Sequence, residues 1–311
     1  MLRMIGWRLL QVVPTLVVAT FIIFALVQII PGDPATQMAG EGATPERIEQ
    51  IRTELGLDQP IVVQYAQWLG DAAQGDLGTS LRANRPVLES VLDRFQVTGQ
   101  LVFVAVLIAG VLGVPFGILA AVRREKWSGK LTRAGAAIGI AIPNFWLAMI
   151  LVVLFALTLG WFPATGWVGF ADAPVQSLRH TLLPAIALST IGVAEVTRQT
   201  ASAMTIALTS DAARTHLAKG IRWRRIIQHA LKNAGVPILT VISLLVSRFL
   251  GATVVIEVVF NLPGAGRLVV EAISWRDFPV VQGVVFVMVL VVLAVNLIAD
   301  LGYRVLDPRI K

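Results

Sequence analysis

The stretch LVFVAVLIAGVLGVPFGILAAV, residues 101–122, decides the fold class because it carries no charged side chain. A membrane's hydrocarbon core is about 30 Å thick, and a helix of about 20 apolar residues crosses it. A second run of this kind, VQGVVFVMVLVVLAVNLIA, occupies residues 281–299. Two such runs predict a membrane protein built from spanning helices.

The composition of the whole chain agrees with this interpretation. Of its 311 residues, 56% are hydrophobic and only 14% are charged, whereas soluble domains have about 25% charged residues. The chain has no cysteine, which excludes disulfides, thiolate catalysis and cysteine-ligated metals. Its three histidines are scattered at positions 180, 216 and 229 and do not suggest a metal site.

Six stretches are long and apolar enough to span a membrane. They are residues 9–30, 99–122, 135–159, 182–206, 236–256 and 281–302. The first exceeds the length of a signal-peptide core and lacks a clear cleavage site, so we expect it to be retained as a span. The fourth gives the weakest signal because Glu195, Arg198 and Gln199 interrupt it. Without it the chain would have five spans and its ends would lie on opposite sides.

The distribution of Lys and Arg predicts the orientation. With the N-terminus inside, the cytoplasmic segments 1–8, 123–134, 207–235 and 303–311 hold sixteen basic residues, whereas the two short external loops hold three. Cytoplasmic loops carry the excess of positive charge, so both ends should be cytoplasmic. The net charge of +7 therefore reflects topology, and nucleic-acid binding is not needed to explain it.

The segment 31–98 is expected outside the cytoplasm as a set of short amphipathic helices. Helix starts are predicted at Pro45, Pro60 and Pro86, and Gly56 should end the first helix. Such helices cannot bury their apolar faces alone. They should lie on the outer membrane surface, on the bundle or against a partner protein, and these alternatives remain open.

The segment 207–235 is expected to form a helix–glycine–helix elbow on the cytoplasmic side. Residues 210–220, SDAARTHLAKG, are typical of a capped helix ended by glycine, and residues 221–232 predict a basic helix leading into the next span. This shape suits docking into a groove of a soluble protein. A basic loop lying on anionic lipid is the alternative.

Sequence motifs for catalysis are absent from the chain. No Walker A motif occurs, because Arg124 stands where the first glycine before Gly129-Lys130 is required. No hydrolase signature occurs either. We therefore expect no catalytic residue, no metal site and no cofactor bound by this chain.

Three ionisable residues inside predicted spans are candidates for a translocation path or gate, because charges within a membrane are costly. Glu195 and Arg198 lie three residues apart on one helix, where they could neutralise each other. Arg248 lies near the middle of the fifth span without a partner in its own helix. It is expected to line a solute path or to form a buried pair.

Segments along the whole chain resemble the peptide, nickel and glutathione permease family of the ATP-binding-cassette (ABC) importers. The matching segments are IIPGDPA (29–35), LGLDQP (55–60), GDLGTS (75–80), AIPNFWL (141–147), LGWFPA (159–164), FNLPGAGRL (260–268), RDFPVVQG (276–283) and LDPRI (306–310). The most specific is RTHLAKG (214–220), which is similar to the family's R-T-A-x-A-K-G coupling motif. His216 replaces the usual small residue, and Ala201 stands where relatives often have a second arginine.

The resemblance implies an all-α membrane protein of the type I (MetI-like) importer class, with six transmembrane helices. Residues 1–30 would form the cytoplasmic N-terminal end and first span, residues 31–98 the extracytoplasmic segment, and residues 99–311 a five-helix core. The cytoplasmic elbow at about 211–222 would be the coupling helix that docks on an ATPase. Its coupling residues would be Asp211, Arg214, Thr215, His216, Ala218, Lys219, Gly220 and Arg222.

The implied function is that of an inner-membrane permease subunit forming half of a path for peptides or similar solutes. The implied partners are a second related permease, two ATPase subunits that bind ATP and Mg²⁺, and an extracytoplasmic binding protein. An ion-coupled secondary transporter is the alternative, although the sequence shows no internal repeat of the kind such carriers often have. A membrane enzyme would need an acid/base or nucleophile constellation, which is not seen.

Overall fold

The computed structural model describes residues 13–25, 34–40, 42–54 and 56–306, and within these the chain is helical without a named strand. An apolar helix covers Val13–Ala25. The later elements are α2 (Pro34–Ala39), α3 (Pro45–Glu54), α4 (Ile61–Ala73), α5 (Val87–Val122), α6 (Trp127–Ala141), α7 (Asn144–Leu151), the π-helix η1 (Val152–Thr158), α8 (Pro174–Thr209), α9 (Asp211–Ala218), α10 (Trp223–Val259), α11 (Ala265–Ser274) and α12 (Phe278–Leu306).

Four helices of the described chain are long and apolar enough to cross a membrane, namely α5, α8, α10 and α12. The bent pair α6 and α7–η1 would raise the number to five. This confirms an α-helical protein with several candidate spans. The first predicted span, 9–30, lies partly outside the described residues, so the total of six remains a prediction.

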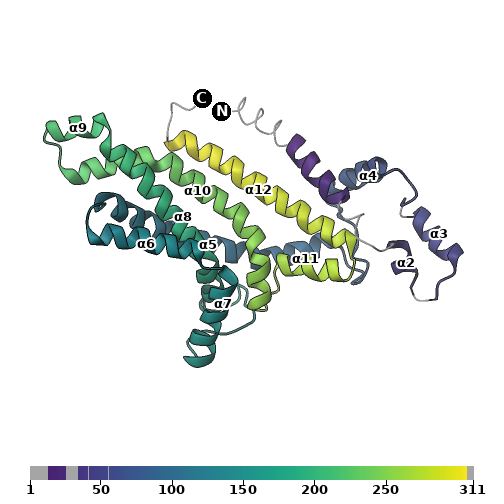
Figure 1. Cartoon of the computed structure of the whole chain (residues 1–311). Helices are drawn as coiled ribbons and strands as arrows, with labels where there is room; N and C mark the ends of the chain where they lie inside the picture. Colours follow the sequence, from purple (N-terminus) through teal and green to yellow (C-terminus); the bar gives the residue numbers. More distant parts are fainter. Residues whose placement is uncertain (1–12, 26–33, 41, 55, 307–311) are drawn as a thin grey trace. The chain divides into compact units, whose positions relative to one another are not determined.

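The third predicted span, 135–159, is not one continuous helix. α6 and the α7–η1 helix meet at a bend of 97° at residues 142–143, and α7 is seen to turn away from α6 (Figure 1). Ile142 precedes a proline and adopts an extended backbone with φ −79° and ψ 122°, the conformation that a following proline favours. Pro143 has no N–H to continue the helix, so the predicted span is divided here into two helices.

Two helices extend beyond their predicted bounds. The external helix predicted from Pro86 and the span from 99 are one helix, α5, because no proline between residues 87 and 99 ends it. The basic helix of the elbow likewise continues directly into the fifth span as α10. Prolines at positions 115, 184 and 237 lie inside α5, α8 and α10 without ending them.

The described chain forms two compact units, with α5 and α12 contributing residues to both. In the first unit, residues up to 97 and 263–293, a buried cluster joins α4, α5, α11 and α12. The helix Val13–Ala25 is fixed to α4 by Tyr65, whose hydroxyl donates to the Val17 carbonyl at 2.9 Å. Trp68 packs edge-on against Phe286 at 5.6 Å between ring centroids. Tyr65 and Trp68, on the apolar side of α4, therefore pack within the first unit.

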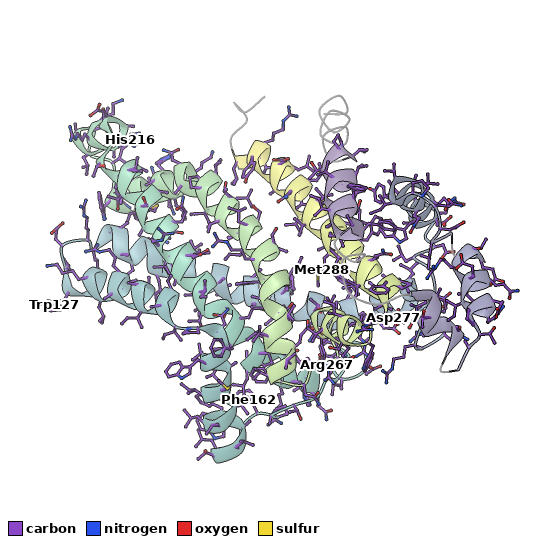
Figure 2. All side chains as sticks on the ribbon, turned by 45° about the vertical axis from the view of Figure 1, so that its right-hand side comes forward. Trp127, Phe162, His216, Arg267, Asp277 and Met288 are labelled. Carbon is purple, nitrogen blue, oxygen red and sulfur yellow. The ribbon has the colours of Figure 1, made fainter. Side chains whose placement is uncertain are left out.

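A buried carboxylate organises the loop before α5 in the same unit. Asp277, between α11 and α12 (Figure 2), is 3% exposed. It accepts hydrogen bonds from the Ser80 hydroxyl at 2.5 Å and the Leu81 backbone N–H at 3.2 Å. The Arg82 guanidinium lies 3.7 Å from the centre of the Trp275 ring. The hydrogen bonds from Ser80 and Leu81 supply the partners that the buried Asp277 carboxylate requires.

The second unit, residues 98–262 and 294–306 of the described chain, depends on close packing between α5 and α8. A Cβ placed on Gly113 would lie 2.7 Å from the Val196 Cβ, and one on Gly117 would overlap Thr200. The absent side chains let the two backbones approach, as the Gly-x-x-x-Gly spacing allows. α8 also packs along α10 (Figure 1), so α8 is the central helix of this unit.

Candidate functional site: a helical elbow and a basic pocket

The elbow begins at a helix cap that the local sequence encodes. The Ser210 hydroxyl accepts a hydrogen bond from the Ala213 N–H at 3.3 Å, which satisfies one free donor in the first turn of α9. Asp211 places a negative charge at the same end, which the helix dipole favours. α9 therefore starts where the sequence predicts.

Gly220 ends α9 and sets the direction of the elbow. Its φ is +70°, a left-handed conformation that glycine adopts without strain. The Gly220 N–H donates to the Leu217 carbonyl at 3.0 Å, and the Ile221 N–H donates to the His216 carbonyl at 3.1 Å. α10 then starts at Trp223, so α9 forms a turn at the end of the α8–α10 pair (Figure 1).

The structure brings the predicted coupling residues together in this one elbow. Asp211 and Arg214 form an exposed ion pair at 3.5 Å, and the Thr215 hydroxyl donates to the Asp211 carbonyl at 2.9 Å. His216, labelled in Figure 2, lies with its ring centroid 5.3 Å from that of His229 on α10. The remaining predicted residues of the elbow are all exposed: Ala218, Lys219, Gly220 and Arg222.

Two apolar residues of the elbow were not singled out from the sequence. Leu217 is 51% exposed and Trp223 is 45% exposed, although both are large apolar side chains. Exposed large apolar side chains in a polar segment are available for contact with a partner protein. Their position among basic residues was the sequence signal that could have identified them.

The ion pair found among the charged residues of the candidate spans joins two helices, whereas a pair along one helix was the expectation for Glu195. Glu195 does not pair with Arg198, its neighbour on α8, but with Arg248 on α10. Because α8 and α10 pack along each other, the carboxylate reaches a guanidinium on the adjacent helix. This pair is not the buried one expected for Arg248, and a role of Arg248 in a solute path remains a prediction. Its side chain remains 60% exposed, whereas that of Glu195 is 16% exposed.

A pocket of about 950 Å³ lies next to this ion pair within the second unit. Its walls come from the end of α5, from α6 and from the second half of α8. The lining residues are Ala120, Arg124, Arg133, Ala136, Ala137, Ile140, Glu195, Thr197, Arg198, Ala201, Ser202, Thr205 and Ile206. The alanine side chains are too small to fill the pocket, and three arginines and one glutamate contribute charge to its lining.

The arginines of the pocket have different surroundings. The Arg133 guanidinium donates to the Ala120 and Arg124 carbonyls at 3.3 and 2.9 Å, which caps the C-terminal end of α5. Arg124 lies 3.8 Å from Glu125. Within the described chain, no hydrogen bond or ion pair engages the exposed side chain of Arg198. No group of three or more potential metal ligands occurs in the same described ranges.

Two family models together cover almost the whole chain. Residues 113–311 match the model described as binding-protein-dependent transport system inner membrane component, and residues 1–102 match its N-terminal counterpart. A putative peptide transport system permease of Brucella abortus is 41% identical over 305 residues, 98% of this chain and 97% of the relative.

Two further relatives match over the same extent. A dipeptide transport system permease of Alkalihalophilus pseudofirmus is 39% identical, covering 98% of each chain. A glutathione transport system permease of Escherichia coli K12 is 36% identical, covering 100% of this chain and 99% of the relative. The chain therefore belongs to the family of binding-protein-dependent transport system inner membrane components, as a multi-pass permease subunit.

Proposed function

We propose that this permease subunit forms half of the translocation path of an ATP-driven importer for peptides or similar small solutes. The names of the relatives as peptide, dipeptide and glutathione permeases support this solute class. An ion-coupled secondary carrier is disfavoured because the family is defined by dependence on a binding protein.

The proposed topology has six spans, with both ends in the cytoplasm and residues 31–98 outside. It is supported by the charge distribution of the loops and by the apolar helix Val13–Ala25, which would belong to the first span. The bent α6 and α7–η1 pair would then count as one broken span. The remaining importer subunits would be a second permease, two ATPases and an extracytoplasmic binding protein.

The α9 elbow is proposed to dock into a groove of an ATPase subunit. The observation that carries this role is the exposure of Leu217 and Trp223 beside basic residues at the tip of the elbow. An apolar anchor surrounded by polar groups is the usual organisation of a protein interface. The surrounding residues 211–222 would add polar contacts.

Energy would enter at the ATPases, which bind ATP and Mg²⁺, and not at this chain. Closure of the ATPase pair would move α9, and α8 and α10, which pack along each other, would transmit that movement to the rest of the bundle. The bundle would face outward to receive solute from the binding protein and return after hydrolysis. ATP shifts the equilibrium only through different contacts in the two arrangements.

A single-cysteine cross-link tests the docking directly. The chain has no cysteine, so Leu217→Cys introduces a single thiol at the tip of the elbow. In native membranes, a thiol-to-amine cross-linker should join this variant to a Walker-motif ATPase. Phe170→Cys, at an exposed position of the predicted external loop, is the matched control and should not form this product. If neither or both variants cross-linked to the ATPase, the proposed docking would be wrong.

A further inference from the structure

The basic pocket contains one guanidinium that the described structure leaves free to bind an anion. Arg133 is engaged by the carbonyls at the end of α5, and the Glu195 carboxylate is engaged by Arg248. Arg198 lines the same pocket and is exposed. Because Glu195 is directed to α10, it does not neutralise Arg198, its neighbour on α8.

The charge balance of the pocket favours a negative occupant. Its lining includes three arginines and one carboxylate, and that carboxylate is already paired. A guanidinium inside a span is costly unless it faces water or a partner. A planar guanidinium binds a carboxylate through two parallel hydrogen bonds.

The dimensions and remaining lining groups fit a small solute. The pocket's volume of about 950 Å³ lies at the upper end of the range for small-molecule sites. Ser202 and Thr205 add hydroxyls beside Arg198, and Ala136, Ala137 and Ala201 keep the walls clear. The Thr205 hydroxyl donates to the Ala201 carbonyl at 2.7 Å, so its oxygen is directed along α8 and can still accept a second bond.

We propose that Arg198 forms, within this pocket, a binding subsite for the free carboxylate of the transported solute. The inference rests on the proposed function as a peptide permease and adds a preference for solutes with a carboxylate end. In the proposed orientation the pocket lies in the cytoplasmic half of the spans, since both α5 and α8 end toward the cytoplasm there. The subsite would hold the solute before release.

The test measures binding of alanyl-phenylalanine and of its C-terminal amide to the complete importer in nanodiscs of phosphatidylcholine. Isothermal titration without the binding protein isolates the membrane subunits. The wild-type importer should bind the free acid about tenfold more tightly than the amide, as expected for one charge-assisted contact. Arg198→Gln should bind both probes equally, and Arg198→Lys should keep part of the preference.

Arg179→Gln is the matched control, because Arg179 is an exposed arginine on the same helix outside the pocket. It should retain the wild-type preference for the acid. Equal binding of acid and amide by the wild-type importer, or an unchanged preference in Arg198→Gln, would overturn the proposal. If Arg198→Gln fails to assemble, the Arg198→Lys measurement decides. Loss of binding of both the acid and the amide by Arg198→Lys would refute a carboxylate contact.

An anionic lipid headgroup offers the same chemistry as a solute carboxylate. Native mass spectrometry with added phosphatidylglycerol distinguishes the two sources. Retention of this lipid by the wild-type importer but not by Arg198→Gln, with no preference between the peptide probes, would overturn the solute subsite. ATP-dependent uptake and co-purification of the ATPase, measured on the same preparations, test the proposed function separately. If the wild-type importer showed neither, the proposed function would be wrong, whatever the peptide probes show.

Discussion

Replacement of Gly220 tests whether the function of the elbow depends on the left-handed backbone conformation of this residue. Gly220 has φ +70° and no atom within 4 Å of a Cβ placed there, so a side chain would fit without a clash. The cost of a substitution is therefore conformational. The left-handed region costs an ordinary L-residue about 1–2 kcal/mol, and a β-branched side chain is among the worst suited to it.

Asparagine provides the matched control because it tolerates the left-handed region. The chain itself uses Asn84 at φ 48° and Asn261 at φ 50°. A strain of about 1–2 kcal/mol corresponds to a population change of about 5–30-fold. Gly220→Val should therefore lower the fraction of elbows in the docking conformation by that factor, while Gly220→Asn should stay near the wild type.

The assay is ATP-driven solute uptake per ATP hydrolysed, measured in proteoliposomes that hold the complete importer. Gly220→Val should reduce this ratio about 5–30-fold, with the chain still inserted and assembled with its permease partner. Equal behaviour of the Val and Asn variants, whether both active or both inactive, would refute the conformational argument.

Three further predictions concern the stability of the detergent-solubilised protein, measured as thermal unfolding. Asp277→Ala should destabilise the first unit by about 1–3 kcal/mol, because it leaves buried hydrogen-bond donors without their acceptor; an unchanged melting temperature would contradict this. Gly113→Leu should destabilise the second unit by about 1–3 kcal/mol through overpacking against α8. The control Gly135→Ala, with open space at its Cβ, should be neutral or slightly stabilising. Equal losses of stability in the two variants would contradict the close-packing argument. A double-mutant cycle of Glu195→Gln and Arg248→Gln should show a coupling energy of at least about 0.5 kcal/mol, and additive effects would show that the pair does not interact.

The sequence predicts those features that depend on neighbouring residues. Ser210 and Gly220 mark the start and end of α9 through local hydrogen bonds, and the apolar run at 101–122 lies within one helix. The size of the bend at Pro143 was not predictable, because the apolar character continues on both sides of it. A proline within an apolar run permits either a mild kink or a full break, and packing of the two halves decides between them.

Features that depend on contacts between helices were not predictable from the sequence. Whether Glu195 forms its ion pair with Arg198 or with Arg248 depends on how α8 packs against α10. The basic pocket draws its lining from three helices, so no single sequence window contains it. The role of Arg133 in capping α5 likewise requires the turn between α5 and α6 to be folded.

Affinity purification of the tagged chain from mildly solubilised native membranes, with mass spectrometry of the co-purifying proteins, tests the central claim most directly. We predict that a second permease of the same family and Walker-motif ATPases will co-purify, and that uptake by the reconstituted complex will require ATP. A chain that purifies alone and still transports solute without ATP would contradict the account.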